Sequence, residues 1–207
     1  FFSPLFFSLS LFAEVHNPLT FTPLFSFVLP LPTHVFPGET LFNIMGKVLE
    51  LMKEKDAYLV ATISAGKFVA EQAKIPGSYP AIIVPKAIAI GAQIQNTFKK
   101  AYEFGVPLAF GTDAGVYPHG DNAKEFIYMN EVGMPISEAL HLATFVNADL
   151  LDEADQLGQL KTGYLADIIA TDENPEDEIS TLTNASFVMK KLGFSSLKPF
   201  LYCDLFF

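Results

Sequence analysis

A single carboxylate follows an apolar run in the middle of the chain. Residues 106–110 are apolar and typical of a short buried strand, the run stops at Gly111, and Asp113 follows two residues later. Residues 116–121 have the composition of a loop and include His119. A carboxylate at the end of a buried strand suits a metal ligand or a proton acceptor. The local pattern fits equally well an Asp113 that has no chemical role and only caps a turn.

A helix is expected to begin directly after this loop. Asn122 is a favourable N-cap residue, and Glu125 stands three positions later, which is the spacing of a capping box. Strand, carboxylate, loop and helix together form a βα unit. In α/β barrels the catalytic groups lie at this C-terminal edge of the strands.

Helical and strand patterns alternate around this unit. Apolar residues recur at helical spacing in four segments, and short apolar runs bounded by turn residues occur in three. Gly105 stands where a helix C-cap is expected, and a loop with Pro76 and Pro80 follows the first strand. The expected helices are 41–52, 85–104, 123–132 and 136–150, and the expected strands are 58–63, 106–110 and 165–170. This order implies parallel strands joined by helical crossovers, an α/β fold.

Composition limits the partners and the metal ligands. The 207 residues are 50% hydrophobic with a net charge of −10, so no basic surface is available for nucleic acid. One cysteine, Cys203, excludes both a disulfide framework and a thiolate metal cluster. A metal would therefore be held by His, Asp or Glu, and only four histidines are present.

The two ends of the chain differ from the rest. Residues 1–38 are rich in Phe, Leu and Pro and contain no Lys or Arg. They lack the positive region of a signal peptide, and prolines interrupt every window long enough for a membrane helix. A segment foreign to the functional protein is the favoured interpretation, with a packed extension or a poor membrane anchor as alternatives. We therefore discount His16 and His34 as ligands, and we interpret His141 as a surface residue of its helix.

Several motifs in order resemble one enzyme family. Residues 109–115 and 118–125 (AFGTDAG and PHGDNAKE) are similar to the last barrel strand and following loop of metal-dependent amidohydrolases. Residues 138–148 resemble the next helix, residues 158–169 the return into a small domain, and residues 58–67 the preceding strand. The resemblance covers about residues 41–189 and is strongest to the imidazolonepropionase-like and Xaa-Pro dipeptidase-like branch.

The resemblance implies a fold and a division of the chain. The fold would be the C-terminal portion of a TIM-type (β/α)8 barrel with the start of the return into a small β-sandwich domain. The expected divisions are a Phe-rich extension at 1–38, a partial barrel at 39–155, a β-sandwich segment at 156–192 and an atypical tail at 193–207.

The resemblance also implies a chemistry. In such enzymes a divalent metal, with zinc the first expectation, activates water for hydrolysis of carbon–nitrogen bonds. The aspartate at the end of the last barrel strand binds the metal and transfers the proton of the attacking water. Asp113 matches that position, as both metal ligand and catalytic residue. His119 would contact the substrate, a small amide or dipeptide.

The chain also departs from the family pattern. No His-x-His pair is present, and a barrel takes about 250 residues, so residues 41–152 suffice for only the last two or three βα units. One carboxylate cannot complete a zinc site. We therefore expect a fragment that is inactive by itself. We also expect a cytoplasmic location and the ability to form a homo-oligomer. The alternatives are a non-catalytic half-barrel that serves as an interaction module and a membrane-associated remnant.

Overall fold

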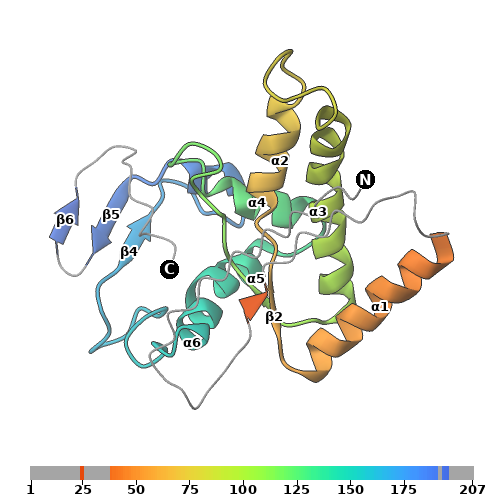
Figure 1. Cartoon of the computed structure of the whole chain (residues 1–207). Helices are drawn as coiled ribbons and strands as arrows, with labels where there is room; N and C mark the ends of the chain where they lie inside the picture. The colour runs from red at the N-terminus through yellow and green to blue at the C-terminus, as the bar shows by residue number, and fades with distance from the viewer. Residues whose placement is uncertain (1–23, 26–37, 191–192, 196–207) are drawn as a thin grey trace.

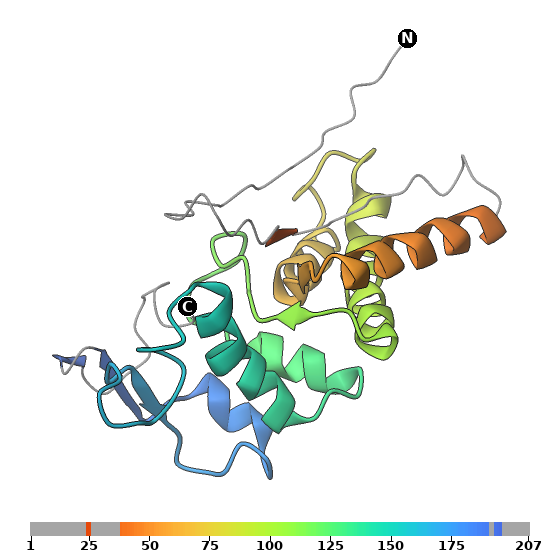
Figure 2. The same ribbon diagram turned by 90° about the horizontal axis from the view of Figure 1, so that it is seen from below.

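The computed structural model describes residues 24–25, 38–190 and 193–195. His16, His34, Cys203, most of the Phe-rich extension and all of the tail after residue 195 lie outside this part of the chain. Leu24–Phe25, within the extension, form strand β1 beside the body of the molecule (Figures 1 and 2). The proposed domain boundaries stay predictions.

The described chain contains a parallel and an antiparallel sheet. The parallel sheet has the order β1-β2-β3, with β2 at Tyr58–Val60 and β3 at Leu108–Ala109. Leu59 lies opposite Leu108, and Val60 lies opposite Ala109. The antiparallel sheet consists of β4 (Ile168–Ala170), β5 (Phe187–Lys190) and β6 (Gly193–Ser195). It lies at one side of the molecule, away from β2 (Figures 1 and 2).

Helices connect and cover the parallel strands. Helix α1 spans Gly38–Glu54, α3 spans Val84–Phe104, and α4 spans Lys124–Glu131, close to the predicted bounds. Gly105 ends α3 with φ of +77°, as expected for a glycine C-cap. None of the helices in the described part of the chain is long and apolar enough to cross a membrane.

The predicted end of the first strand was wrong, and one helix was missed. The strand ends at Val60, and helix α2 begins at Ile63 and runs to Gln72, where a loop was expected. Thr62 adopts a left-handed conformation at φ +49° between them and provides no side-chain cap. The helix packs along α3 (Figure 1), where a Cβ on Gly91 would lie 3.1 Å from that of Ala70.

The predicted helix at 136–150 is one continuous helix whose middle turn is π-helical. It consists of α5 (Ile136–His141), a π-helical segment η1 (Leu142–Val146) and α6 (Asn147–Leu150). His141 is exposed, as expected, and stacks on Phe145. A 3-10 segment, η2 (Ile179–Thr183), leads into β5 and packs against α4.

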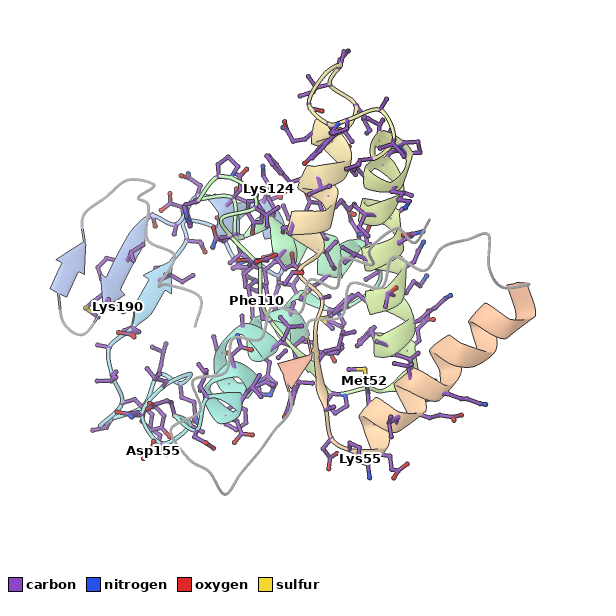
Figure 3. The ribbon with its side chains drawn as sticks, viewed as in Figure 1. Met52, Lys55, Phe110, Lys124, Asp155 and Lys190 are labelled. Atoms are coloured by element: carbon purple, nitrogen blue, oxygen red, sulfur yellow. The ribbon has the colours of Figure 1, made fainter. Side chains whose placement is uncertain are left out.

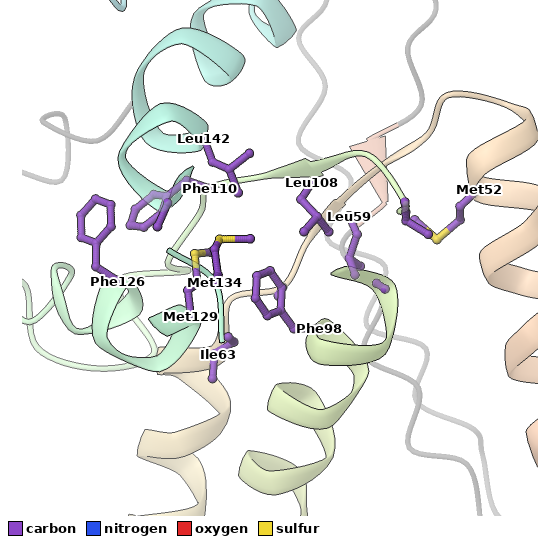
Figure 4. Close-up of a cluster of buried hydrophobic side chains, with 14 of the residues drawn as sticks. Met52, Leu59, Ile63, Phe98, Leu108, Phe110, Phe126, Met129, Met134 and Leu142 are labelled. Atoms are coloured by element: carbon purple, nitrogen blue, oxygen red, sulfur yellow. The ribbon is translucent and has the colours of Figure 1, made fainter. Parts of the chain in front are cut away.

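One hydrophobic core joins the parallel sheet to its helices (Figure 4). Ile63 at the start of α2 and Phe98 in α3 are fully buried, as are Met129 in α4 and Met134 three residues after its end. The rings of Phe110 and Phe126 stack with centroids 4.3 Å apart. The core therefore extends to the C-terminal end of β3, directly below the segment that carries Asp113.

Candidate active site

The C-terminal ends of β2 and β3 form one edge of the parallel sheet. The two strands are parallel neighbours, so the residues that follow each strand lie side by side. Gly111 follows β3, and a Cβ there would overlap Cγ1 of Val60. This close approach requires glycine and brings the segment after β3 against the end of β2.

Asp113 lies exposed on a tight turn at this edge. Its backbone adopts φ of +51°, a left-handed conformation that Asp tolerates better than most residues. The Asp113 carbonyl accepts a bond from Val116 N at 3.3 Å, and Gly115 N donates to the Tyr117 carbonyl at 3.2 Å. The carboxylate is thus presented to solvent at the strand end, as the sequence predicted.

His119 lies on the loop that continues from this turn. It is exposed, and the next residue, Gly120, has φ of +101° and donates its N–H to Asn122 Oδ1 at 3.2 Å. Asp113 and His119 are therefore on one connected loop. Whether His119 contacts a substrate stays a prediction.

The predicted capping box of the following helix was wrong. Ala123 is the N-cap residue of α4, with no side-chain cap bond. Asn122 instead turns back to the loop, where its Nδ2 donates to Thr112 Oγ1 at 3.4 Å. The second residue of the expected box, Glu125, bonds a different helix altogether.

Glu125 is a fully buried carboxylate that caps helix α2. Its Oε1 accepts from Ile63 N at 2.8 Å, and its Oε2 accepts from Ser64 N at 2.7 Å. These are two of the N–H groups that a helix N-terminus leaves without an intrahelical partner. Thr62 provides no side-chain cap, and a negative charge is favourable at a helix N-terminus. Glu125 therefore links α4 to the segment that follows β2.

Burial dominates the electrostatics of this cluster. It raises the pKa of Glu125 to about 7, against the opposing effects of the Ser64 hydroxyl and of the Ser64 and Ile63 N–H groups. Burial likewise raises the pKa of Tyr117 to about 12, with the charges of Glu125 and Asp113 adding to the rise. Ser64 Oγ and Tyr117 Oη are buried beside them, and neither completes a hydrogen bond with the described residues.

The raised pKa of Glu125 predicts a pH-dependent stability. Between its ordinary pKa of 4.5 and about 7, the folded state binds more protons at this site than the unfolded state. The contribution of Glu125 is therefore most favourable below the ordinary pKa and is lost as pH rises through about 7, a change on the order of 3 kcal/mol. Urea unfolding measured from about pH 4 to 8 should show this decline, and Glu125→Gln should remove it. An unfolding free energy whose pH dependence is the same in both proteins would contradict the prediction.

A second buried side chain holds the end of β3. The Asn147 amide accepts from Phe110 N at 3.0 Å through Oδ1 and donates to Phe110 O at 2.9 Å through Nδ2. It thereby bonds both backbone groups of Phe110, three residues before Asp113. Asn147 begins α6, directly after the π-helical segment, and such segments are frequent at functional sites.

The described residues do not provide a complete metal site. Asp113 is a suitable oxygen ligand, but no group of three His, Cys, Asp or Glu side chains among the residues with described placement could hold a metal ion. A zinc site needs at least three protein ligands. Further ligands would have to come from residues other than those described.

Comparison with known proteins identifies the family. The profile of the amidohydrolase family matches residues 38–195. The chain belongs to the amidohydrolase family. Among curated relatives, ochratoxinase of Aspergillus niger is 37% identical over 139 residues, which are 64% of this chain and 27% of ochratoxinase.

Solved structures of amidohydrolase relatives agree with this assignment. A Xaa-Pro dipeptidase with methionine bound in its active site is 52% identical, with a TM-score of 0.67 over 70% of this chain and 36% of the dipeptidase. The crystal structure of Aspergillus niger ochratoxinase is 33% identical, with a TM-score of 0.56 over 72% of this chain and 34% of the enzyme. These neighbours imply a TIM-barrel-type fold. The chain spans 27% to 36% of the length of the relatives named here.

The sequence predicted the two exposed residues of the candidate site and missed the buried ones near them. Asp113 and His119 stood in a recognisable motif. Glu125 was expected to cap its own helix, α4, but caps α2 instead. Asn147 was predicted only as part of the segment 138–148 that resembles the family. One signal was available for each: a carboxylate on the apolar side of a helix, and an amide within an apolar stripe, both of which need buried partners.

Proposed function

We propose that the amidohydrolase to which this chain belongs hydrolyses a carbon–nitrogen bond in a small amide or dipeptide. The observation that carries the proposal is the exposed carboxylate of Asp113 at the C-terminal end of β3. It is supported by the 52% identity to a Xaa-Pro dipeptidase over 70% of the chain. The 37% identity to ochratoxinase supports the same reaction class.

In the proposed reaction Asp113 transfers a proton. A water oxygen bonds to the amide carbon, and the Asp113 carboxylate accepts the proton that this water releases. The same proton then passes to the leaving nitrogen as the carbon–nitrogen bond breaks. His119, on the adjoining loop, would bind a carboxylate or carbonyl oxygen of the substrate and orient it.

A divalent metal is expected from the family, with zinc the first candidate. Asp113 would be one ligand, and the remaining ligands would lie elsewhere in the complete protein. We therefore propose that this chain is inactive without those additional residues.

We further propose how the described chain fits the barrel. Strands β2 and β3 would be the last two barrel strands, and β4, β5 and β6 would begin the small β-sandwich domain. The barrel segment would run over residues 39–155 and the sandwich segment over 156–192, with a cytoplasmic location and a homo-oligomer as further expectations.

A second candidate function is a non-catalytic half-barrel that binds another chain. The order β1-β2-β3 leaves β3 at an edge of the parallel sheet, paired on one side within the described part of the chain. Such an edge offers backbone groups to a further strand. Stable expression as a complex without metal would favour this candidate over the hydrolase.

The decisive experiment combines metal analysis with a chimaera. The purified chain is expected to bind no stoichiometric zinc and to hydrolyse no dipeptide. A chimaera in which this chain replaces the matching segment of the similar Xaa-Pro dipeptidase should hydrolyse dipeptides, because the dipeptidase contributes the remaining residues. Asp113→Asn in that chimaera should lower kcat/KM about 100-fold or more, since proton transfer is lost.

The matched control is Asp155→Asn, an exposed aspartate after the last helix of the barrel segment. It should leave kcat/KM of the chimaera within about twofold of the unsubstituted value. Full activity of the Asp113→Asn chimaera would contradict the proposed role of Asp113 in proton transfer. Metal binding and hydrolysis by the isolated chain would overturn the proposal that it is incomplete.

A further inference from the structure

The turn that carries Asp113 has little backbone support of its own. Its two internal backbone hydrogen bonds are long, at 3.2 and 3.3 Å. Asp113 adopts a left-handed φ of +51°, which costs a residue other than glycine on the order of 1 kcal/mol or more. Asp113 and Val116 are exposed, so the turn gains little from their burial. A side chain outside this backbone geometry must therefore hold the turn in place.

Tyr117, the last residue of the turn, provides that contact. Its side chain points into the protein and only 5% of the residue is exposed, whereas Val116 beside it is 42% exposed. The Tyr117 ring packs against Phe68 of α2, with centroids 6.2 Å apart and an interplanar angle of 46°. The turn is thus attached to the helix that follows the neighbouring strand.

The hydroxyl at the far end of the Tyr117 ring is buried as well. Burial raises the pKa of Tyr117 to about 12, and the charges of Glu125 and Asp113 add to the rise. Ser64 belongs to the first turn of α2, and its N–H donates to Glu125 at 2.7 Å. Glu125 therefore fixes the start of the helix against which Tyr117 packs.

We propose that Tyr117 is a positioning residue that holds Asp113 at the strand edge by packing its ring on Phe68 of α2. The contacts run from the Asp113 turn through Tyr117 to α2, and from α2 through Glu125 to α4. Helices α2 and α4 are neighbours (Figure 1), and Lys124 marks the start of α4 in Figure 3. The role of Asp113 in hydrolysis rests on the proposed function, but the positioning itself does not. The ring is the anchor, and the Tyr117 hydroxyl is not required for it.

The test is 15N relaxation of the purified 207-residue chain, measured without metal or substrate. Backbone order parameters of Asp113, Ala114 and Val116 are expected near 0.85 in the unsubstituted chain and below about 0.6 in Tyr117→Ala. Tyr117→Phe keeps the ring and should restore the values to within about 0.1 of the unsubstituted chain. The 13C shifts of Asp113, which report its left-handed backbone, should change in Tyr117→Ala and return in Tyr117→Phe.

Phe68→Ala provides an independent route to the same result. Phe68 is half-buried, so its loss is less disruptive to folding, and it should also lower the order parameters of the turn. Tyr128→Phe on α4 is the control and should change none of them. Residues of α3 such as Ala101 should remain rigid in all variants.

Three outcomes would contradict the proposal. The turn would stay rigid in Tyr117→Ala and Phe68→Ala, or α3 would loosen to the same extent as the turn, or Tyr117→Phe would loosen the turn as much as Tyr117→Ala. None of these readouts depends on hydrolysis. A loss of turn order together with a fully active Asp113→Asn chimaera would therefore support the positioning and refute the role of Asp113 in the proposed reaction.

Discussion

Glu125→Ala is expected to lower the free energy of unfolding by about 3–5 kcal/mol. The substitution removes the acceptor of two buried N–H groups, those of Ile63 and Ser64, and leaves a cavity where the carboxylate and its methylenes were. An unsatisfied buried donor costs about 1–3 kcal/mol, and here there are two. Urea unfolding near pH 7, monitored by circular dichroism, measures the loss.

Two variants make this result specific to the buried cap. Glu103→Ala changes an exposed glutamate near the end of α3 and should cost less than about 1 kcal/mol. Glu125→Gln keeps the size and one acceptor oxygen of Glu125, so its cost should lie between the two. A loss below about 1 kcal/mol for Glu125→Ala would mean that water replaces the carboxylate at the start of α2.

Asn147→Ala is expected to lower the free energy of unfolding by about 2–4 kcal/mol. The Asn147 amide satisfies both the N–H and the carbonyl of Phe110, and both bonds are buried. Alanine leaves these two backbone groups without a partner at the end of β3. The measurement is again urea unfolding, together with amide hydrogen exchange at Phe110, which should become faster.

Asn147→Asp distinguishes the two hydrogen bonds. Aspartate keeps an acceptor for Phe110 N but places a negative charge beside Phe110 O, so it should destabilise the protein at least as much as alanine near pH 7. Asn96→Ala, at an exposed position of α3, is the control and should cost less than about 0.5 kcal/mol. Equal stabilities of Asn147→Ala and Asn96→Ala would contradict the assigned role of Asn147.

The buried cap formed by Glu125 explains why the sequence predicted some helices correctly and missed another. The helix α3 was predicted from its apolar spacing, and its end from Gly105, because both signals are local. Helix α2 was missed because its N-terminus is capped by Glu125, 62 positions away from Ile63. Thr62 stands at the N-cap position but makes no side-chain cap bond, and the apolar run at 58–63 was predicted as a strand that included the first residue of α2.

The same reasoning applies to the capping box at Asn122 and Glu125. The spacing of the two residues was that of a capping box, but no box forms because the Glu125 side chain is buried in the core. Glu125 lies on the core side of α4 beside Phe126 and Met129, so its carboxylate is removed from the start of its own helix. Only the packing of α4 on α2 determines which N–H groups it meets.

The sequence by itself determined the strand, the turn and the carboxylate of Asp113, since an apolar run, glycines and a motif are local properties of the chain. It also determined the amidohydrolase family, through motifs in a specific order. Only the tertiary structure decided which buried side chains support that carboxylate: Glu125 through Ile63 and Ser64, Asn147 through Phe110, and Tyr117 through Phe68. The physical reason is that a buried polar group or ring must find its partner in three dimensions, and here those partners lie on other elements, far apart in the chain.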